Sequence, residues 1–253
     1  MADAHTGKQV FILGTRVDPT SYSEAVGKII RWAQNKSSCY VCITNVNNVM
    51  EAHDSSLYQK VMNQADLSTP DGMPLVWTMR RLGYPNQERV YGPELARRLI
   101  DLAAEKEIPI GFYGSTRVTL QKLLGVVSKE HPALKIVFSY SPPFYDLSEQ
   151  EDNTISQEIN ESGARILFVG LGCPKQERWM ADHKGKVQAA MVGVGAAFDF
   201  LAGTKSQAPH WMQENGFEWF YRLSREPRRL WRRYFCHNPR FIVLVMWQLL
   251  KIK

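Results

Sequence analysis

The chain has 253 residues, of which 44% are hydrophobic and 22% are charged, as in an ordinary globular protein. A chain of this length buries a full core without disulfides or structural metals. The longest apolar run, residues 241–250, falls short of the ~20 residues that span a bilayer, and residues 1–9 lack the apolar segment of a secretory signal. The composition argues against a membrane-spanning protein and predicts one that is soluble or peripheral to a membrane, in a reducing cytoplasm.

The net charge of +6 is concentrated at the C-terminus. Residues 222–253 hold nine Lys or Arg and one acidic residue, for +8, whereas residues 1–221 hold 22 basic and 24 acidic residues, for −2. Such a local excess predicts an anionic partner for this segment, either lipid headgroups, phosphates or nucleic acid.

Apolar runs alternate with helix-like stretches along the chain. The predicted strands are residues 10–13, 40–43, 108–113, 136–139, 166–169 and 190–194. The predicted helices include residues 23–34, 92–106, 116–129 and 149–162. This order predicts an α/β fold with a mainly parallel, Rossmann-like sheet flanked by helices. The composition changes near Tyr221, so we expect an α/β domain over residues 1–221 and a helical appendage over residues 222–253.

Small polar residues follow the predicted strands, where ligands of open parallel sheets bind. Thr44, Asn45 and Asn47 come directly after residues 40–43. Their hydroxyl and amide groups suit hydrogen bonds to a sugar or a ribose, whereas helix capping is the alternative interpretation. Gly114 follows the next predicted strand and Tyr140 the one after it, and we expect both at the same edge.

Residues 68–74 form a predicted tight turn, punctuated by proline and glycine, that presents Asp71. A single carboxylate on a rigid turn suits a general base that takes a proton from a hydroxyl. The alternative is a turn aspartate that bonds its own backbone.

The segment 170–179 reads as a strand end, a glycine turn and a helix that starts near Pro174. The free N–H groups of a helix start attract anions, so Gly172, Lys175 and Gln176 are predicted to bind substrate. A third glycine is missing at the spacing of dinucleotide-binding enzymes, which argues against NAD. Asp199, after the strand 190–194, is a further candidate for a ribose or base, with a helix-capping role as the alternative.

The basic C-terminal segment carries six arginines within residues 222–233. Arginine suits bidentate binding of phosphate. Pro227 predicts a helix start, Asn238-Pro239 predicts a break, and the apolar segment 241–250 follows. A basic amphipathic helix joined to a short apolar one is typical of an anchor that lies in a membrane interface. The alternative is a terminal helix that packs on the core with solvated arginines.

Several motifs of cofactor and metal chemistry are missing. The sequence has no D-x-D pair and no His/Cys cluster at zinc spacing, and the pair Cys39-x-x-Cys42 lies in an apolar run where buried thiols are commoner. We therefore expect no metal and no cofactor. If a diphosphate leaves, cationic side chains and helix N-termini must stabilise its charge.

Four motifs occur in one order: Thr44-Asn45-Val46-Asn47, Pro70-Asp71-Gly72-Met73-Pro74, residues 170–177 and residues 195–200. Together they resemble the WecG/TagA/CpsF family of bacterial glycosyltransferases over nearly the whole chain. The resemblance implies a UDP-sugar donor, an undecaprenyl-diphosphate-linked sugar acceptor, and inversion without metal during bacterial cell-surface polysaccharide synthesis. It also implies an appendage that binds the inner face of the plasma membrane and completes the site.

The resemblance assigns the catalytic base to Asp71 and polar substrate contacts to Thr44, Asn47 and Gln176. It places the appendage arginines within residues 222–233, of which we expect Arg222, Arg225 and Arg229 to act in catalysis and Arg232 in substrate binding. Two other functions remain open at this stage. One is a nucleic-acid-binding protein that uses the arginine-rich tail, although we expect no nucleic acid partner. The other is a membrane adaptor with a degenerate nucleotide site.

Overall fold

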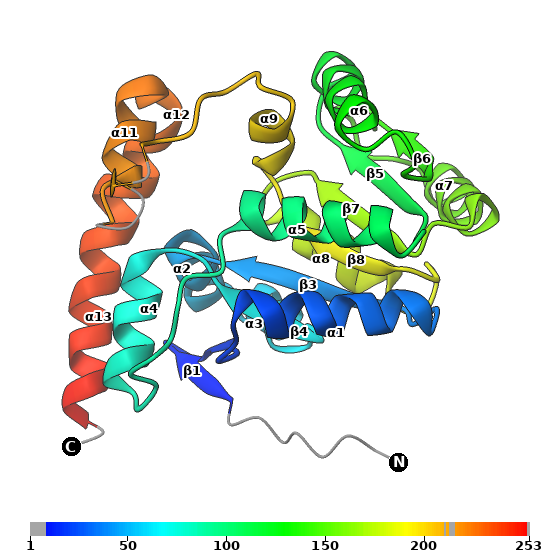
Figure 1. Ribbon diagram of the computed structural model, residues 1–253. Helices are drawn as coiled ribbons and strands as arrows, with labels where there is room; N and C mark the ends of the chain where they lie inside the picture. The colour runs from blue at the N-terminus through cyan, green and yellow to red at the C-terminus, as the bar shows by residue number, and fades with distance from the viewer. Residues whose placement is uncertain (1–8, 210, 213–215, 252–253) are drawn as a thin grey trace.

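A six-stranded parallel sheet forms the centre of the protein in the computed structural model, which describes residues 9–209, 211–212 and 216–251 (Figure 1). The strand order is β4-β3-β8-β7-β5-β6, and every neighbouring pair is parallel. The strands are β3 (Cys39–Thr44), β4 (Leu67–Pro70), β5 (Ile110–Gly114), β6 (Ile136–Tyr140), β7 (Ile166–Gly170) and β8 (Ala190–Gly193). The predicted α/β class with a mainly parallel sheet is confirmed.

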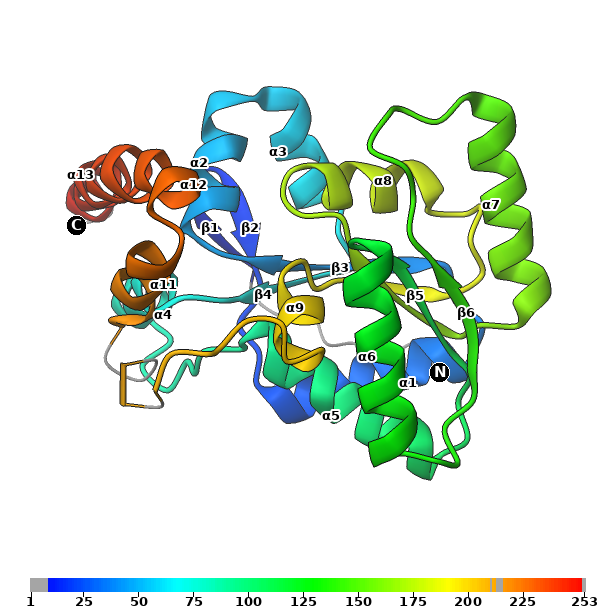
Figure 2. The same ribbon diagram turned by 90° about the horizontal axis from the view of Figure 1, so that it is seen from above.

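Helices cover both faces of the sheet (Figure 2). One layer contains α1 (Tyr22–Gln34), α5 (Gly92–Glu105) and α6 (Arg117–Glu130), and the short α9 (Ala197–Leu201) packs beside it. The other contains α2 (Val46–Asp54), α3 (Ser56–Asn63), α7 (Glu149–Ser162) and α8 (Lys175–His183). Strand β3 contributes side chains to the cores on both faces of the sheet. Val41 and Ile43 pack against the first layer of helices, while Tyr40 and Cys42 pack against the second.

Two sequence predictions about strands need correction. Residues 10–13 were predicted as a strand alongside the others, but β1 (Val10–Ile12) pairs only with β2 (Thr15–Val17), in a separate antiparallel hairpin. Leu13 and Gly14 form its turn with positive φ angles of 50° and 82°, which suits a two-residue hairpin. The second concerns residues 68–74, which are predicted as a turn. Their first residues belong to strand β4, in which buried Ser68 and Thr69 interrupt the apolar pattern.

The described part of the C-terminal segment is helical apart from a bend at Glu226. It comprises α11 (Glu218–Arg225), α12 (Pro227–Arg232), the π-helical turn η1 (Arg233–His237) and α13 (Asn238–Lys251). The predicted break at Asn238-Pro239 coincides with the boundary at which η1 ends and α13 begins, and Pro239 occupies the first turn of α13, where its missing N–H costs little. The composition change at Tyr221 falls inside α11 and coincides with no end of a helix.

One face of α13 packs against the α/β domain, beside α4 (Met73–Arg81) in Figure 1. Phe241 and Val245 are buried against the β1–β2 hairpin, α2 and α4. The Gln248 amide accepts from the Leu13 N–H at 2.8 Å and donates to the Phe11 carbonyl at 2.7 Å. Arg240 forms an ion pair of 2.6 Å with Asp54. These contacts fix the helix on the hairpin edge.

The opposite face of α13 is apolar and open to solvent. Its side chains are 54% to 69% exposed and comprise Ile242, Val243, Met246, Trp247 and Leu250. Within the described residues, no helix combines the length and the hydropathy needed to cross a bilayer. We call these five side chains the outer face of α13.

Candidate active site

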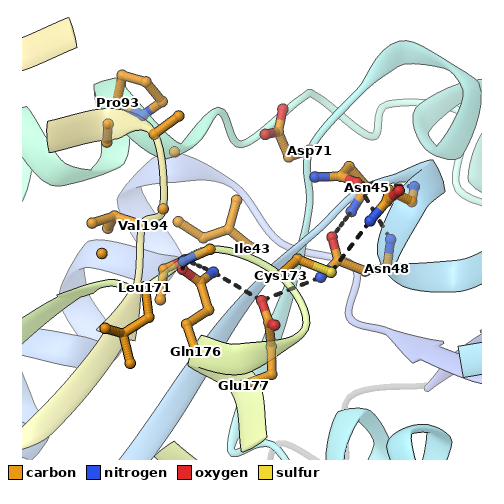
Figure 3. Close-up of a pocket in the computed structure, with 18 of the residues that line it drawn as sticks. Ile43, Asn45, Asn48, Asp71, Pro93, Leu171, Cys173, Gln176, Glu177 and Val194 are labelled. Carbon is orange, nitrogen blue, oxygen red and sulfur yellow. Dashed lines mark hydrogen bonds between the residues drawn. The ribbon is translucent and has the colours of Figure 1, made fainter. Parts of the chain in front are cut away.

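A cavity of about 750 Å³ lies at the carboxyl ends of β3, β7 and β8 and reaches the C-terminal helices. This is the edge that the sequence analysis predicted, and its volume lies within the range of small-molecule sites. Figure 3 shows side chains from these strand ends and from α2 and α8 pointing into it. The predicted site residues that line it are Asn45, Asn47, Asp71, Gly172, Gln176, Asp199 and Arg222.

Glycines at this edge of the sheet allow the backbone to pack closely against neighbouring strands and side chains. A Cβ on Gly170 would lie 2.7 Å from the Phe198 ring, and one on Gly193 would lie 2.6 Å from the Met180 methyl group. Gly114 has φ +126°, and its Cβ would lie 2.6 Å from the Gly170 backbone. Packing alone therefore requires glycine at Gly114, where the neighbour is backbone, and favours it at Gly170 beside the Phe198 ring, before any ligand is considered.

A buried polar network holds the wall formed by α8 (Figure 3). The Gln176 amide donates to the Gly193 carbonyl at 3.2 Å and to Glu177 at 2.8 Å, and its oxygen accepts from the Gly172 N–H at 3.1 Å. Glu177 also accepts from Asn48 at 3.2 Å and from the Tyr58 hydroxyl at 3.0 Å. Burial raises the pKa of Glu177, against the lowering effect of these donors. Both N–H groups of Gln176 are thus already engaged, which makes it a fixed part of the wall.

Asn45 and Asn47 stand at the start of α2. The Asn45 side chain caps the helix by accepting from the backbone N–H of Asn47 at 3.0 Å, so the capping interpretation is confirmed for it. Asn47 reaches the C-terminal segment, where its Oδ1 lies 3.2 Å from His237 Nδ1. Its amide nitrogen also donates to Cys173 Sγ at 3.3 Å. Asn47 therefore joins α2, the loop before α8 and η1 at one point.

Asp71 follows β4 directly, and its backbone N–H donates to the Thr44 carbonyl at 2.7 Å. Gly72, with φ 106°, then turns the chain into α4. The Arg89 guanidinium donates to Asp71 Oδ1 at 2.9 Å and to Glu218 Oε2 at 2.6 Å. One arginine thus joins the turn carboxylate to the first residue of α11. Arg89 also lies over the Tyr91 ring, 4.3 Å from its centroid.

The surroundings of Asp71 favour a proton acceptor. Burial raises the pKa of Asp71, Arg89 opposes this, and the Glu218 carboxylate raises it further. Such a carboxylate is a stronger base than an exposed aspartate, as general-base catalysis requires. Arg89 and Glu218 could not be found from the sequence, because no spacing along the chain indicates a contact between residues 129 positions apart.

The appendage arginines differ in their positions. Arg222 lines the cavity, 3.7 Å from Glu218 Oε1 and 5.3 Å from the Phe200 ring centroid. Arg225 is exposed, lies over the Tyr221 ring and is not among the residues that line the cavity. The predicted residues Arg229 and Arg232 have side chains outside the part that the structure describes.

Four other predicted binding residues lie outside the cavity lining given by the described residues. Thr44 is fully buried and shares a hydrogen bond of 2.7 Å with Ser68, because this strand end faces β4. Tyr140 stacks on Tyr113 at 6.0 Å. Lys175 is exposed, and its ammonium lies 3.9 Å from the Asp146 carboxylate. Gly114 allows β5 to pack closely against the backbone of Gly170. Their roles toward substrate stay predictions.

Asp199 lines the cavity but is already paired. Its carboxylate forms an ion pair of 3.1 Å with Lys205. Among the described residues, no group of three or more His, Cys, Asp or Glu side chains gathers as metal ligands would. Cys39 and Cys42 are buried, and burial raises the pKa of the Cys39 thiol to about 12.

Comparison with known proteins adds to this geometry. A protein of Bacillus spizizenii named N-acetylglucosaminyldiphosphoundecaprenol N-acetyl-beta-D-mannosaminyltransferase is 29% identical over 214 residues, which cover 84% of this chain and 80% of that protein. A Staphylococcus aureus protein of the same name is 28% identical over 227 residues, which cover 88% and 87%. Residues 10–253 match the Glycosyl transferase WecG/TagA/CpsF family. With its site at the sheet edge and its motifs in order, the chain belongs to this family of glycosyltransferases.

Proposed function

We propose that this protein transfers a sugar from a UDP-sugar to a saccharide linked to undecaprenyl diphosphate, with inversion and without a metal ion. The acceptor follows the names of the relatives, and the donor and stereochemistry follow the family resemblance. The observation that carries the proposal is the position of Asp71, a partly buried carboxylate that lines a nucleotide-sized cavity together with Arg222.

In this mechanism the UDP-sugar lies across the strand ends, with its diphosphate near the glycine turns. Asp71 takes the proton of the acceptor hydroxyl, and the oxygen attacks the anomeric carbon from the face opposite to UDP. The bond from that carbon to the diphosphate breaks, and UDP leaves with the electron pair. Arg222 stabilises the charge that develops on UDP.

The proposal is tested by incubating the full chain with a series of UDP-sugars and a short-chain lipid-diphosphate sugar, with Mg²⁺ or with EDTA. We expect acceptor-dependent UDP release with one donor, at equal rates in both buffers, and a β-linked product by NMR. Binding of UDP-sugar without release would indicate an adaptor. Activity that stops on chelation and returns with Mg²⁺ would exclude the metal-independent mechanism.

We further propose that residues 222–253 hold the enzyme at the inner face of the plasma membrane. The outer face of α13 supplies apolar side chains, and the basic residues of this segment suit anionic headgroups. This arrangement brings a water-exposed site to an acceptor that stays in the bilayer.

Replacing Met246 and Trp247 together by glutamate is expected to weaken binding to anionic vesicles about tenfold or more, because apolar burial is lost and charge is repelled. Vesicle co-sedimentation measures this. Phe144→Glu, at a side chain that is 94% exposed on the loop between β6 and α7, is the control and is expected to bind as the unmodified chain does. Equal vesicle binding by both variants would contradict the anchor.

The pH dependence of transfer follows from the neighbours of Asp71. A base works only when deprotonated, so the rate falls as the pH drops through the pKa of Asp71 in the complex. Glu218 raises that pKa and Arg89 lowers it. Glu218→Gln is therefore expected to shift the acidic limb of kcat to lower pH, and Arg89→Gln to higher pH. Rate profiles measured over pH 4–9 that move together in both variants would contradict this assignment.

A further inference from the structure

A second, smaller cavity of about 100 Å³ adjoins the first at Asp71. Asn45, Asn47, Asp71 and Arg222 line both cavities. From there the second cavity extends toward the start of α4, the start of α11 and the turn into α13, away from the ends of β7 and β8. Asp71 thus stands between a large cavity over the sheet and a small one beneath the appendage.

The lining of the second cavity combines aromatic and polar groups. Trp219 is 38% exposed, and its ring lies 5.9 Å from that of Tyr234 at a tilt of 54°. Asn238 adds an amide to those of Asn45 and Asn47. A partly exposed indole face packs on the C–H face of a sugar ring, while the Asn238 amide can donate to and accept from its hydroxyls, Asn45 and Asn47 being held in the helix cap and the contacts to His237 and Cys173. This chemistry suits a single pyranose, and the volume leaves no room for a nucleotide.

The position of the cavity indicates which sugar it takes. In an inverting transfer the acceptor hydroxyl and the leaving UDP lie on opposite sides of the anomeric carbon, with the base on the acceptor side. Asp71 faces both cavities, so a sugar in the second one presents its hydroxyl to Asp71 while the nucleotide fills the first.

The cavity is also close to the surface that we assign to the membrane. Asn238 lines it and is the first residue of α13, whose outer face is apolar. A sugar held in the cavity therefore lies next to the helix whose outer face we assign to the membrane.

We propose that this second cavity is the subsite for the pyranose of the lipid-linked acceptor, with Trp219 as the platform on which the ring stacks. This inference rests on the proposed function, and it assigns the acceptor side of the reaction to residues of α11, η1 and α13. The appendage thereby binds the substrate's sugar as well as the membrane.

The test is Trp219→Ala, assayed with a short-chain, detergent-soluble acceptor so that membrane binding plays no part. We expect the KM for the acceptor to rise about tenfold while the KM for the UDP-sugar stays within about twofold, since only acceptor stacking is lost. Trp219→Phe keeps an aromatic face and is expected to recover most of the affinity. Phe220→Ala is the matched control, because Phe220 contacts Trp219 edge-on at 5.9 Å yet lines neither cavity.

A binding measurement separates this inference from the proposed function. Saturation-transfer NMR with N-acetylglucosaminyl diphosphate on a short alkyl chain reports the subsite without turnover. Signal that is present with the unmodified chain and lost with Trp219→Ala supports the subsite even if no donor is found. A raised KM for the donor alone, an equal loss in Phe220→Ala, or acceptor binding that Trp219→Ala leaves intact would overturn it.

Discussion

Replacing Asp71 by asparagine is expected to lower kcat about 10²- to 10⁴-fold, because the proposed mechanism uses this carboxylate as the base that removes the proton of the acceptor hydroxyl. Asparagine has the same shape, and its Oδ1 still accepts from Arg89, which donates to Asp71 at 2.9 Å. Arg89 also keeps Glu218 as its ionic partner. The variant should therefore fold normally and bind UDP with unchanged affinity.

Steady-state transfer measures the rate, and calorimetry with UDP measures binding. Asp54→Asn is a suitable control, because Asp54 is a surface carboxylate paired with Arg240 and belongs to neither cavity lining. Retention of more than a tenth of the activity in Asp71→Asn would mean that another group takes the proton.

The second large effect is expected at Arg222. Arg222→Gln should lower kcat about 10²- to 10³-fold, the usual cost of losing one group that stabilises charge in the transition state. Arg222 lies in both cavity linings, next to Glu218 and opposite the strand ends. In the proposed mechanism, the charge on the leaving diphosphate develops next to this guanidinium.

Arg225→Gln provides the comparison, since Arg225 lies three residues further along α11 but stacks on Tyr221 at the surface. A much smaller loss is expected there, and Arg222→Lys should restore part of the rate by returning the charge without the planar guanidinium. Equal losses at the two arginines would show that the charge of the whole segment matters rather than the position of Arg222.

The general fold could be predicted because it depends on local patterns. Apolar runs such as residues 166–169 are buried on both faces of the sheet, and β7 lies where they predict it. The strand Val10–Ile12 shows what such patterns do not predict. An apolar run indicates a strand but does not indicate which sheet that strand joins. Strand β4 was missed for the opposite reason, because it contains buried polar residues in place of an apolar run: the Ser68 hydroxyl bonds the Thr44 hydroxyl, and the Ser68 backbone N–H donates to Asp18.

The site could be predicted only in part. The sequence placed Asp71, Asn47 and Gln176 at one edge, since parallel strands end at the same side of a sheet, and all three line the cavity. The direction of the Thr44 side chain could not be predicted in this way, because its hydroxyl is bonded to Ser68 inside the sheet.

The amino-acid sequence by itself determined the α/β class, the order of the motifs and the basic C-terminal segment, because helix and strand periodicity and charge are local properties. Only the tertiary structure decided that Arg89 joins Asp71 to Glu218 and that His237 meets Asn47, 190 residues away. Such contacts arise when separate elements pack on a common core, and no spacing along the chain encodes them. The second cavity at Trp219 exists for the same reason, since α4, α11 and α13 form its wall only after they fold together.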